Sequence, residues 1–403
     1  MSRRSDTLPR VEGTQAPLHA APPRPGRRRR LVTLVAALAA VGGGIAGLAL
    51  AGAPSNSLPQ VTGRAPKAPL ALARYDARAF LTRYLAADGR VIRRDQGGDT
   101  VSEGQGYAML LAVAIGDRRD FDLAWQWDRA NLQLSDHLSS YHWQDGTVTG
   151  KDPASDADLD MAWALVLAGH RFHDPTLKTQ GLEVASSILA NETVSAGGHI
   201  ELVAGPWARA VPYALDPSYL APEAMQALAA ASGDPRWTQL FDDSISLVST
   251  LDSAGSARLP PDWASLEVTG AVRPASPPST STAPAYGLDA QRVPVWYAAD
   301  CSARARHVAA GTWPILQSVA GHGGDLAYSL TGASESKLVN PLGYVAAAAA
   351  ADASGDRSAA AGLLDRAQTQ SARYHTYYGD AWVALGRILL DTKLLSACPP
   401  SPA

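Results

Sequence analysis

Apolar residues recur at helical spacing along most of the chain. Segments of about 10 to 15 residues, the length of ordinary helices, are rich in Ala and Leu and are separated by Gly, Pro or Asp. Few segments alternate apolar and polar residues as half-buried strands do. The pattern predicts an all-α body. Its expected helices are 107–117, 121–132, 160–172, 179–192, 222–234, 237–251, 342–356, 359–371 and 380–395.

These helices fall into two populations. Residues 107–115 and 161–172 are apolar almost all the way round, whereas others carry one apolar stripe and one charged face. A helix of the first kind must be buried on every side. Two populations indicate an inner ring wrapped by an outer ring, an (α/α)6 barrel of six helical hairpins being one such toroid. A stacked solenoid would give a similar pattern, but no repeat of fixed period supports it.

The N-terminal region predicts a transmembrane helix. Four arginines, 27–30, precede a run without charge, 31–53, which as a helix would span about 35 Å. The arginines would keep the first end in the cytoplasm. The alternative is a cleaved signal peptide, because residues 51–53 read Ala-Gly-Ala, although Pro54 disfavours cleavage there. Either way, the remaining chain would be exported, as an anchored or a secreted protein.

The chain then divides into four regions. Residues 1–30 form a basic cytoplasmic tail, 31–53 the anchor or signal segment, 54–70 a linker rich in Pro and Ser, and 71–398 the folded body. Within the body, 268–287 is so rich in Pro, Ser and Thr that we expect a loop throughout.

Charge and composition exclude several classes of protein. The chain has 403 residues, 46% of them hydrophobic, and a formal net charge of −3. Residues 1–30 hold eight Arg against two acidic residues, so the remainder is acidic, which argues against nucleic-acid binding. The two cysteines, Cys301 and Cys398, give no zinc signature, and both a single bridge and unpaired thiols remain open. No metalloprotease, nucleophile-elbow, P-loop or dinucleotide motif occurs, so no metal or organic cofactor is expected.

Carboxylates and aromatic residues remain as candidates for chemistry. The richest cluster is the segment 154–172, in which Asp156, Asp158 and Asp160 enter a buried helix. From spacing alone a capping box is favoured, with Ser155 as the N-cap and Asp158 at the third helical position. A calcium loop is not expected, because the turn glycine and the bidentate Glu that it needs are missing.

The same segment resembles the signature of glycoside hydrolase family 8, an Asp-x-Asp entry into an apolar helix that ends in an aromatic residue. Other motifs similar to that family follow in the expected order. They are SEGQGYAMLLAV at 102–113, DPSYLAPEA at 216–224, LPPDW at 259–263, LDAQRVPVW at 288–296 and HTYYGDAWVAL at 375–385. The resemblance therefore covers nearly the whole expected body.

The resemblance implies a set of catalytic residues. Glu103 matches the family's general acid and Asp289 the general base of its cellulase-type branch. Asp156 matches the signature acid that contacts the sugar near the scissile bond, and Arg292 matches the arginine next to the base. Asp158 lies in the same segment and is a candidate sugar ligand. Inverting hydrolysis needs one protonated carboxyl and one carboxylate, roughly 6.5 to 9.5 Å apart, with a water between.

Aromatic residues beside these motifs are candidates for sugar platforms. The chain has 10 Trp and 13 Tyr but only four Phe, a bias toward flat rings with a polar edge. The candidates are Trp143, Trp207, Tyr219 and Tyr378. Trp125 and Trp127 lie within one expected helix, and packing explains them better.

The resemblance implies a membrane-tethered, exported endo-β-1,4-glucanase that works by inversion without a cofactor. Its partner would be β-1,4-glucan, either plant cellulose or glucan at a cellulose synthesis complex. Two departures from the family stand near the base: Asp216 replaces an Asn and Leu288 replaces a Tyr. The alternatives are the same fold acting on chitosan or xylan, and a glucan-binding protein that has lost catalysis.

Overall fold

The computed structural model describes residues 58–59, 61, 65–318, 327–336 and 338–396. The expected tail and anchor, 1–53, lie outside these residues, as does Cys398, while Cys301 is disulfide-bonded. Within the part of the chain that is described, no helix is long and apolar enough to cross a membrane.

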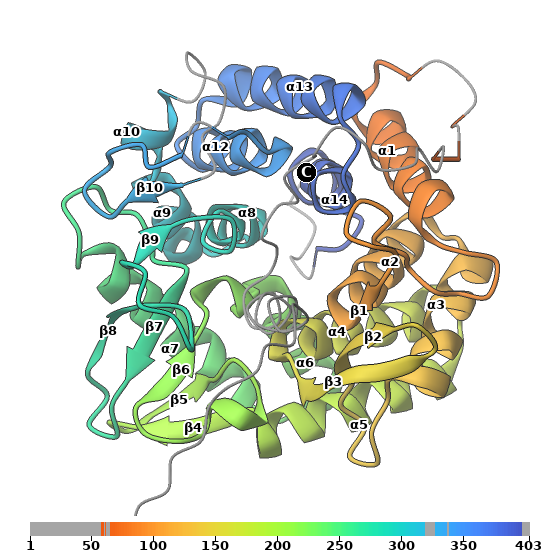
Figure 1. Ribbon diagram of the computed structural model, residues 1–403, viewed down its shortest axis with the longest axis horizontal. Coiled ribbons are helices and arrows are strands. Elements are labelled where there is room, and N and C mark those ends of the chain that lie inside the picture. The colour runs from red at the N-terminus through yellow and green to blue at the C-terminus, as the bar shows by residue number, and fades with distance from the viewer. Residues whose placement is uncertain (1–57, 60, 62–64, 319–326, 337, 397–403) are drawn as a thin grey trace, which may run out of the picture. The chain divides into compact units, whose positions relative to one another are not determined.

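Six helices of the described body pack in a closed cycle, each against the next, and the last also packs against the first (Figure 1). These inner helices are α2 (Ser102–Ile115), α4 (Ser155–Arg171), α6 (Pro222–Ser232), α8 (Arg292–Ala299), α12 (Pro341–Ala353) and α14 (Tyr377–Asp391). The predicted inner ring is therefore present, and closure of the cycle distinguishes it from a solenoid.

A second layer of helices wraps this ring. It consists of α1 (Pro69–Tyr84), α3 (Arg118–Asn131), α5 (Pro175–Asn191), α7 (Pro235–Asp252), α9 (Ala303–Gly311) with the short α10 (Trp313–Leu316), and α13 (Arg357–Arg373). Helix α1 packs against both α14 and α2, and each other outer helix packs against the inner helix before it. The prediction of a helix-rich body is confirmed.

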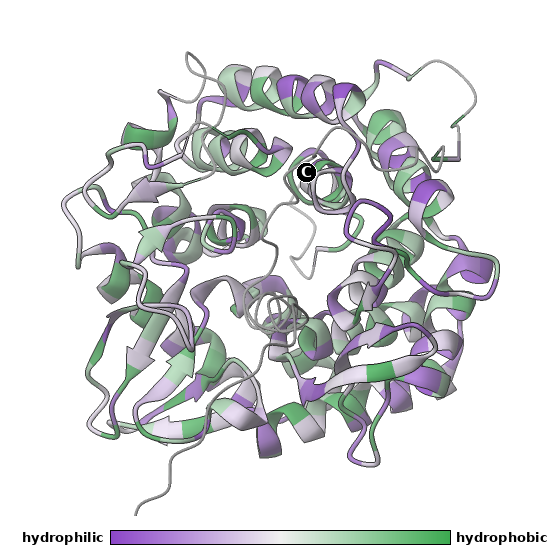
Figure 2. Ribbon diagram, viewed as in Figure 1, coloured by the Kyte–Doolittle hydropathy of each residue, from purple (hydrophilic) through white to green (hydrophobic). Residues whose placement is uncertain are grey.

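Burial separates the two layers as the hydrophobic pattern predicted. Every residue of α2 is buried except Glu103, whereas α3 buries only one face. Hydrophilic residues recur along the outer helix α13 (Figure 2). Trp125 and Trp127 lie in the buried face of α3, which confirms that they pack between elements.

Short antiparallel strands occupy the connections that lead from an outer helix to the next inner helix. The sheets are β1 (Thr100–Val101), β2 (Ser140–Gln144) and β3 (Thr147–Pro153); β4 (Thr193–Ala196) and β5 (His199–Leu202); β6 (Tyr213–Leu215), β7 (Trp263–Leu266) and β8 (Val272–Ala275); and β9 (Ala285–Tyr286) with β10 (Tyr328–Ser329). Because these connections all precede inner helices, they lie where the inner helices begin.

The expectation of a loop throughout 268–287 is wrong. Strands β8 and β9 both fall inside this interval. Strand β8 pairs with β7, with Val272 opposite Leu266 and Pro274 opposite Ala264. Proline is tolerated because β8 is the outer strand of its sheet, which needs no donor on its free side.

Candidate active site

One buried arginine lies in contact with all the carboxylates of the site. Arg292 opens α8 and is only 2% exposed. Its Nη1 donates to Glu103 Oε1 at 3.1 Å and to Asp156 Oδ2 at 2.9 Å, and its Nη2 donates to Asp289 Oδ1 at 3.3 Å. Asp216 Oδ2 lies 3.6 Å from the same Nη2. Residues that are distant in sequence thus meet at the beginnings of the inner helices.

Glu103 is the second residue of α2 and is held by two tyrosines. Tyr107, one turn later on the same helix, donates its hydroxyl to Oε1 at 2.9 Å, and Tyr377, the first residue of α14, donates to Oε2 at 3.1 Å. A Cβ on Gly104 would lie only 3.0 Å from the Tyr377 hydroxyl. The glycine after Glu103 therefore makes room for the second tyrosine.

Burial raises the pKa of Glu103; Arg292 opposes this effect, and the nearby Asp156 adds to it. Burial likewise raises the pKa of Asp289 well above its ordinary value, and Asp216 raises it further. Asp216 itself has a pKa raised to about 7, chiefly by burial. One guanidinium cannot neutralise four carboxylates, so the site favours holding protons on some of them.

Asp262, from the LPPDW motif, fixes the turn that carries Asp289. Its Oδ1 accepts hydrogen bonds from the backbone N–H groups of Gly287 at 2.9 Å and Ala290 at 2.8 Å. A Cβ at Gly287 would approach Asp262 Oδ2 to 2.2 Å, so only glycine fits this contact. Asp262 thereby holds the backbone on both sides of Asp289.

The capping box predicted at the start of α4 is wrong. Ser155 donates its hydroxyl to the carbonyl oxygen of Val203 at 2.6 Å, and the N-cap, Ala154, has no side-chain hydrogen bond. Asp158 is 0% exposed and accepts from the backbone N–H of Ser139 at 2.8 Å. The polar side chains at the start of α4 make tertiary contacts instead of capping the helix. Asp158 lies in the interior, whereas Asp156 contacts Arg292.

The four candidate aromatic platforms lie in different surroundings. Tyr219 lies under the Arg292 guanidinium, 5.3 Å from the ring centre, and the Tyr378 hydroxyl lies 3.5 Å from the carbonyl oxygen of Leu288. Trp207 is 37% exposed and lies against a buried Trp, with ring centres 6.4 Å apart. Trp143, on β2, makes an edge contact with Trp127, and Arg90 covers its ring at 4.6 Å.

Sequence reasoning missed three residues of this site: Tyr107, Tyr377 and Asp262. The spacing of Tyr107 four residues after Glu103 places both on one helix face, which was a usable signal. Tyr377 and Asp262 lie in matched motifs, but nothing in their spacing connects them to Glu103 or Asp289. Across the residues that the structure describes, no group of three or more His, Cys, Asp or Glu side chains could hold a metal ion.

Fold and site together define a protein with a two-layered ring of helices. Its buried carboxyl groups lie close together where the inner helices begin. The family model for glycosyl hydrolases family 8 matches residues 70–382. The chain therefore belongs to glycosyl hydrolases family 8, which confirms the family predicted from the motifs.

Curated relatives and solved structures agree with this assignment. A Novacetimonas hansenii protein named "Probable endoglucanase" is 37% identical over 230 residues, which are 54% of this chain and 64% of the relative. An endoglucanase of Cellulomonas uda is 30% identical over 224 residues, 54% of this chain and 61% of that one. Each match thus covers less than two thirds of the relative's length. The solved endo-β-1,4-glucanase of Acetobacter xylinum is 31% identical with a TM-score of 0.67 and covers 80% of this chain and 98% of its own.

Proposed function

We propose that the chain is an endo-acting β-1,4-glucanase that hydrolyses its substrate with inversion. The observation that carries the proposal is the bridge from Glu103 through Arg292 to Asp289, where the inner helices of a family 8 fold begin. The names of the relatives support glucan as the substrate. The residues of this chain suggest how each step would proceed.

Glu103 acts as the general acid. Its raised pKa favours the protonated form, which can give a proton to the glycosidic oxygen as the bond breaks. The hydroxyls of Tyr107 and Tyr377 contact different oxygens of this carboxyl group and fix its plane. Proton transfer depends on such positioning because the acid must lie within hydrogen-bond reach of the leaving oxygen.

Asp289 acts as the general base. Ionised Asp289 would take a proton from a water that attacks the anomeric carbon on the face opposite Glu103, giving an α-configured product. Glu103 and Asp289 bind different nitrogens of Arg292, so the guanidinium lies between the two carboxyl groups. Asp156 binds the same guanidinium, and both would contact the sugar.

Purified residues 65–403 would test the proposal by release of reducing ends from carboxymethyl cellulose, mixed-linkage β-glucan, xylan and chitosan. We expect cleavage of the glucans, and a loss of at least 100-fold in Glu103→Gln and Asp289→Asn, because a lost acid or base typically costs roughly 10²–10⁴-fold. Glu183→Gln, a change of the same type at an exposed position of α5, serves as the control. Cleavage of only xylan or chitosan, or a first product of β configuration by NMR, would contradict the proposal.

We also propose that residues 31–53 anchor the chain in the cell membrane with the body exported, which suits a polymeric substrate that stays outside the cell. Nascent glucan at a cellulose synthesis complex would then be within reach. Alkaline extraction of membranes from cells that make the full chain checks the anchor. Quantitative release of the protein would disprove it.

A further inference from the structure

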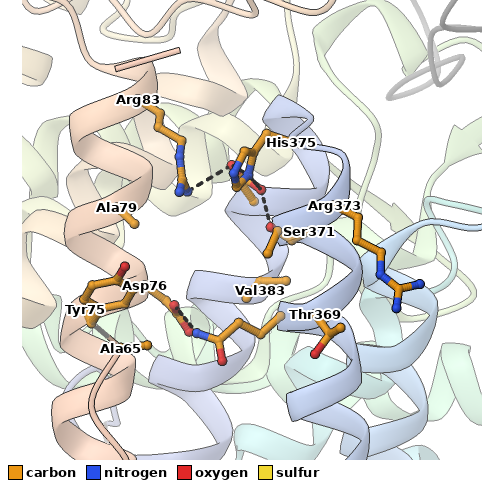
Figure 3. Close-up of a pocket in the computed structure, with 13 residues that line it drawn as sticks. Ala65, Tyr75, Asp76, Ala79, Arg83, Thr369, Ser371, Arg373, His375 and Val383 are labelled. Carbon is orange, nitrogen blue, oxygen red and sulfur yellow. Dashed lines mark hydrogen bonds and ion pairs between the residues drawn. The ribbon is translucent and has the colours of Figure 1, made fainter. Parts of the chain in front are cut away.

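A hollow lies in the outer wall of the ring, between α1, α13 and α14 (Figure 3). Its volume is about 460 Å³, within the range of roughly 300–1,000 Å³ of small-molecule sites. Helix α1 contributes Tyr75, Asp76 and Arg83, and helix α13 contributes Gln368 and Thr369. None of these residues takes part in the carboxylate site.

Asp76 supplies a buried polar atom that lacks a hydrogen bond. The residue is 7% exposed, and its Oδ1 accepts from Gln368 Nε2 at 2.7 Å, as Figure 3 shows. Its Oδ2 has no hydrogen-bond donor within the described residues, and the nearest cationic atom, Arg387 Nε, is 3.9 Å away. The atom is fully buried, so a ligand hydroxyl reaches it only if the Asp76 side chain turns toward the cavity; the new hydrogen bond would then offset a cost of about 1–3 kcal/mol.

At the other end of the cavity, Asp380 is already saturated. It accepts hydrogen bonds from Tyr84 at 3.0 Å, from Arg83 Nη1 at 3.3 Å and from Ser371, and His375 Nδ1 lies 3.0 Å from it. Arg83 and His375 are therefore committed to Asp380. They do not form a free cationic pair of the kind that a phosphate or sulfate group needs.

The lining selects a neutral ligand that carries many hydroxyl groups. The acidic residues Asp76 and Asp380 in the lining disfavour an anion, while Arg83 and Arg373 disfavour a simple cation. Sugar hydroxyls donate and accept at once, which suits a lining that holds both donor and acceptor side chains. Tyr75 adds a ring whose face suits the apolar face of a pyranose.

We propose that this cavity is a second saccharide-binding site, which holds a short stretch of glucan on the outside of the ring. The identity of the sugar as β-1,4-glucan rests on the proposed function. The first turn of α14 separates the two sites, because Tyr377 faces Glu103 whereas Asp380 faces the cavity. A glucan bound there would be held close to the carboxylate site without occupying it.

The experiment uses cellotetraose as the probe and calorimetry as the readout, with Glu103→Gln to prevent turnover. We expect two binding sites in this variant, and a loss of at least tenfold in affinity at one of them when Tyr75→Ala is added. Tyr374→Ala is the matched control, because Tyr374 is 74% exposed and lies outside the cavity. Thr369→Trp, which fills the mouth from an exposed position, should cause the same loss as Tyr75→Ala.

Two further readouts separate this inference from the proposed function. With Glu103 intact, Tyr75→Ala should hydrolyse cellotetraose normally but be retained at least fivefold less on insoluble cellulose. Equal binding by the Tyr75→Ala and Tyr374→Ala variants, or a single site in Glu103→Gln, would overturn the second site even if hydrolysis is seen. Binding that depends on Tyr75 in a protein that hydrolyses no glucan would keep the site and reject the proposed activity.

Discussion

Asp216 places an additional buried acid beside the proposed base. Its Oδ1 accepts from the backbone N–H and the hydroxyl of Ser218, whereas its Oδ2 faces Arg292 at 3.6 Å without a hydrogen bond. Asp289 shares the same guanidinium nitrogen. A negative charge on Asp216 therefore acts directly on Asp289, and after burial it is the largest cause of the raised pKa of Asp289.

We predict that Asp216→Asn extends activity to lower pH. The proposed base must be ionised, so we expect activity to be lost as pH falls through the pKa of Asp289. Removing the charge of Asp216 lowers that pKa, and the acidic limb of kcat/KM should move to lower pH. The measurement is kcat/KM on a soluble glucan from pH 4 to 9, beside Asp145→Asn, a control on an exposed turn. An acidic limb that stays in place or moves upward would refute the coupling.

At this scale, the sequence identified the charged residues better than their partners. Glu103, Asp156, Asp289 and Arg292 are brought together as the motifs implied. The contact between Glu103 and Tyr377 spans 274 positions, so it depends on closure of the ring and not on local spacing. The interior position of Asp158 was missed for a similar reason, because its partner is a backbone N–H in the connection before α4.

Close packing between neighbouring helices depends on glycines at defined positions. Gly181, in the middle of α5, faces α4, and a Cβ there would lie 2.9 Å from side-chain atoms of Leu165 and Val166. Gly362, in the middle of α13, has nothing within 4 Å of the same atom. The two positions share helical backbone and differ in what surrounds them.

We predict opposite effects of the same substitution at these two glycines. Gly362→Ala should stabilise the protein by up to about 1 kcal/mol, because alanine is the better helix former. Gly181→Ala should destabilise it by about 1–3 kcal/mol, because the added methyl group forces α4 and α5 apart. Urea denaturation of both variants beside the parent measures the difference. Stabilisation by both changes would show that the helices can adjust without cost.

Elements were predictable where burial determines their pattern. Helices α2 and α4 are buried on nearly all sides, so their apolar runs identified the inner ring. The strands were not predictable, because most have only two to five residues and their partners are distant. Strand β6 pairs with β7, about 50 residues later, and β9 has two residues that pair with β10. No local periodicity can arise in segments so short.

At the scale of the whole molecule, several buried acids that make no ion pair with Arg292 share one property. Burial raises the pKa of Asp76, Asp128 and Asp262 to about 7, and that of Glu201 to about 8. Between pH 4 and these values, the folded chain keeps protons that the unfolded chain has released. The free energy of unfolding therefore falls as pH rises through this interval.

We predict that the body is more stable at pH 5 than at pH 8 and that Asp128→Asn reduces this difference. Asn keeps an acceptor for the Ser139 hydroxyl, which donates to Asp128 at 2.7 Å, but it never ionises. At pH 8 the variant should be more stable than the parent by roughly 2–4 kcal/mol, with little difference at pH 4.5. Denaturation midpoints across pH provide the measurement. An equal gain at both pH values, or the same gain in Asp145→Asn, would rule out ionisation as the cause.

The ring is closed by its first and last helices, so its contacts form in a definite order while the protein is made. Arg83 on α1 binds Asp380 on α14 across 297 positions, and α14 packs against α2. A ribosome releases α14 after all other inner helices, so the partially synthesised chain already contains Glu103, Asp156 and Asp289 but not Tyr377. The longest-range contacts form last because they close the largest loop. The second tyrosine that holds Glu103 is therefore in place only after α14 has packed against α2.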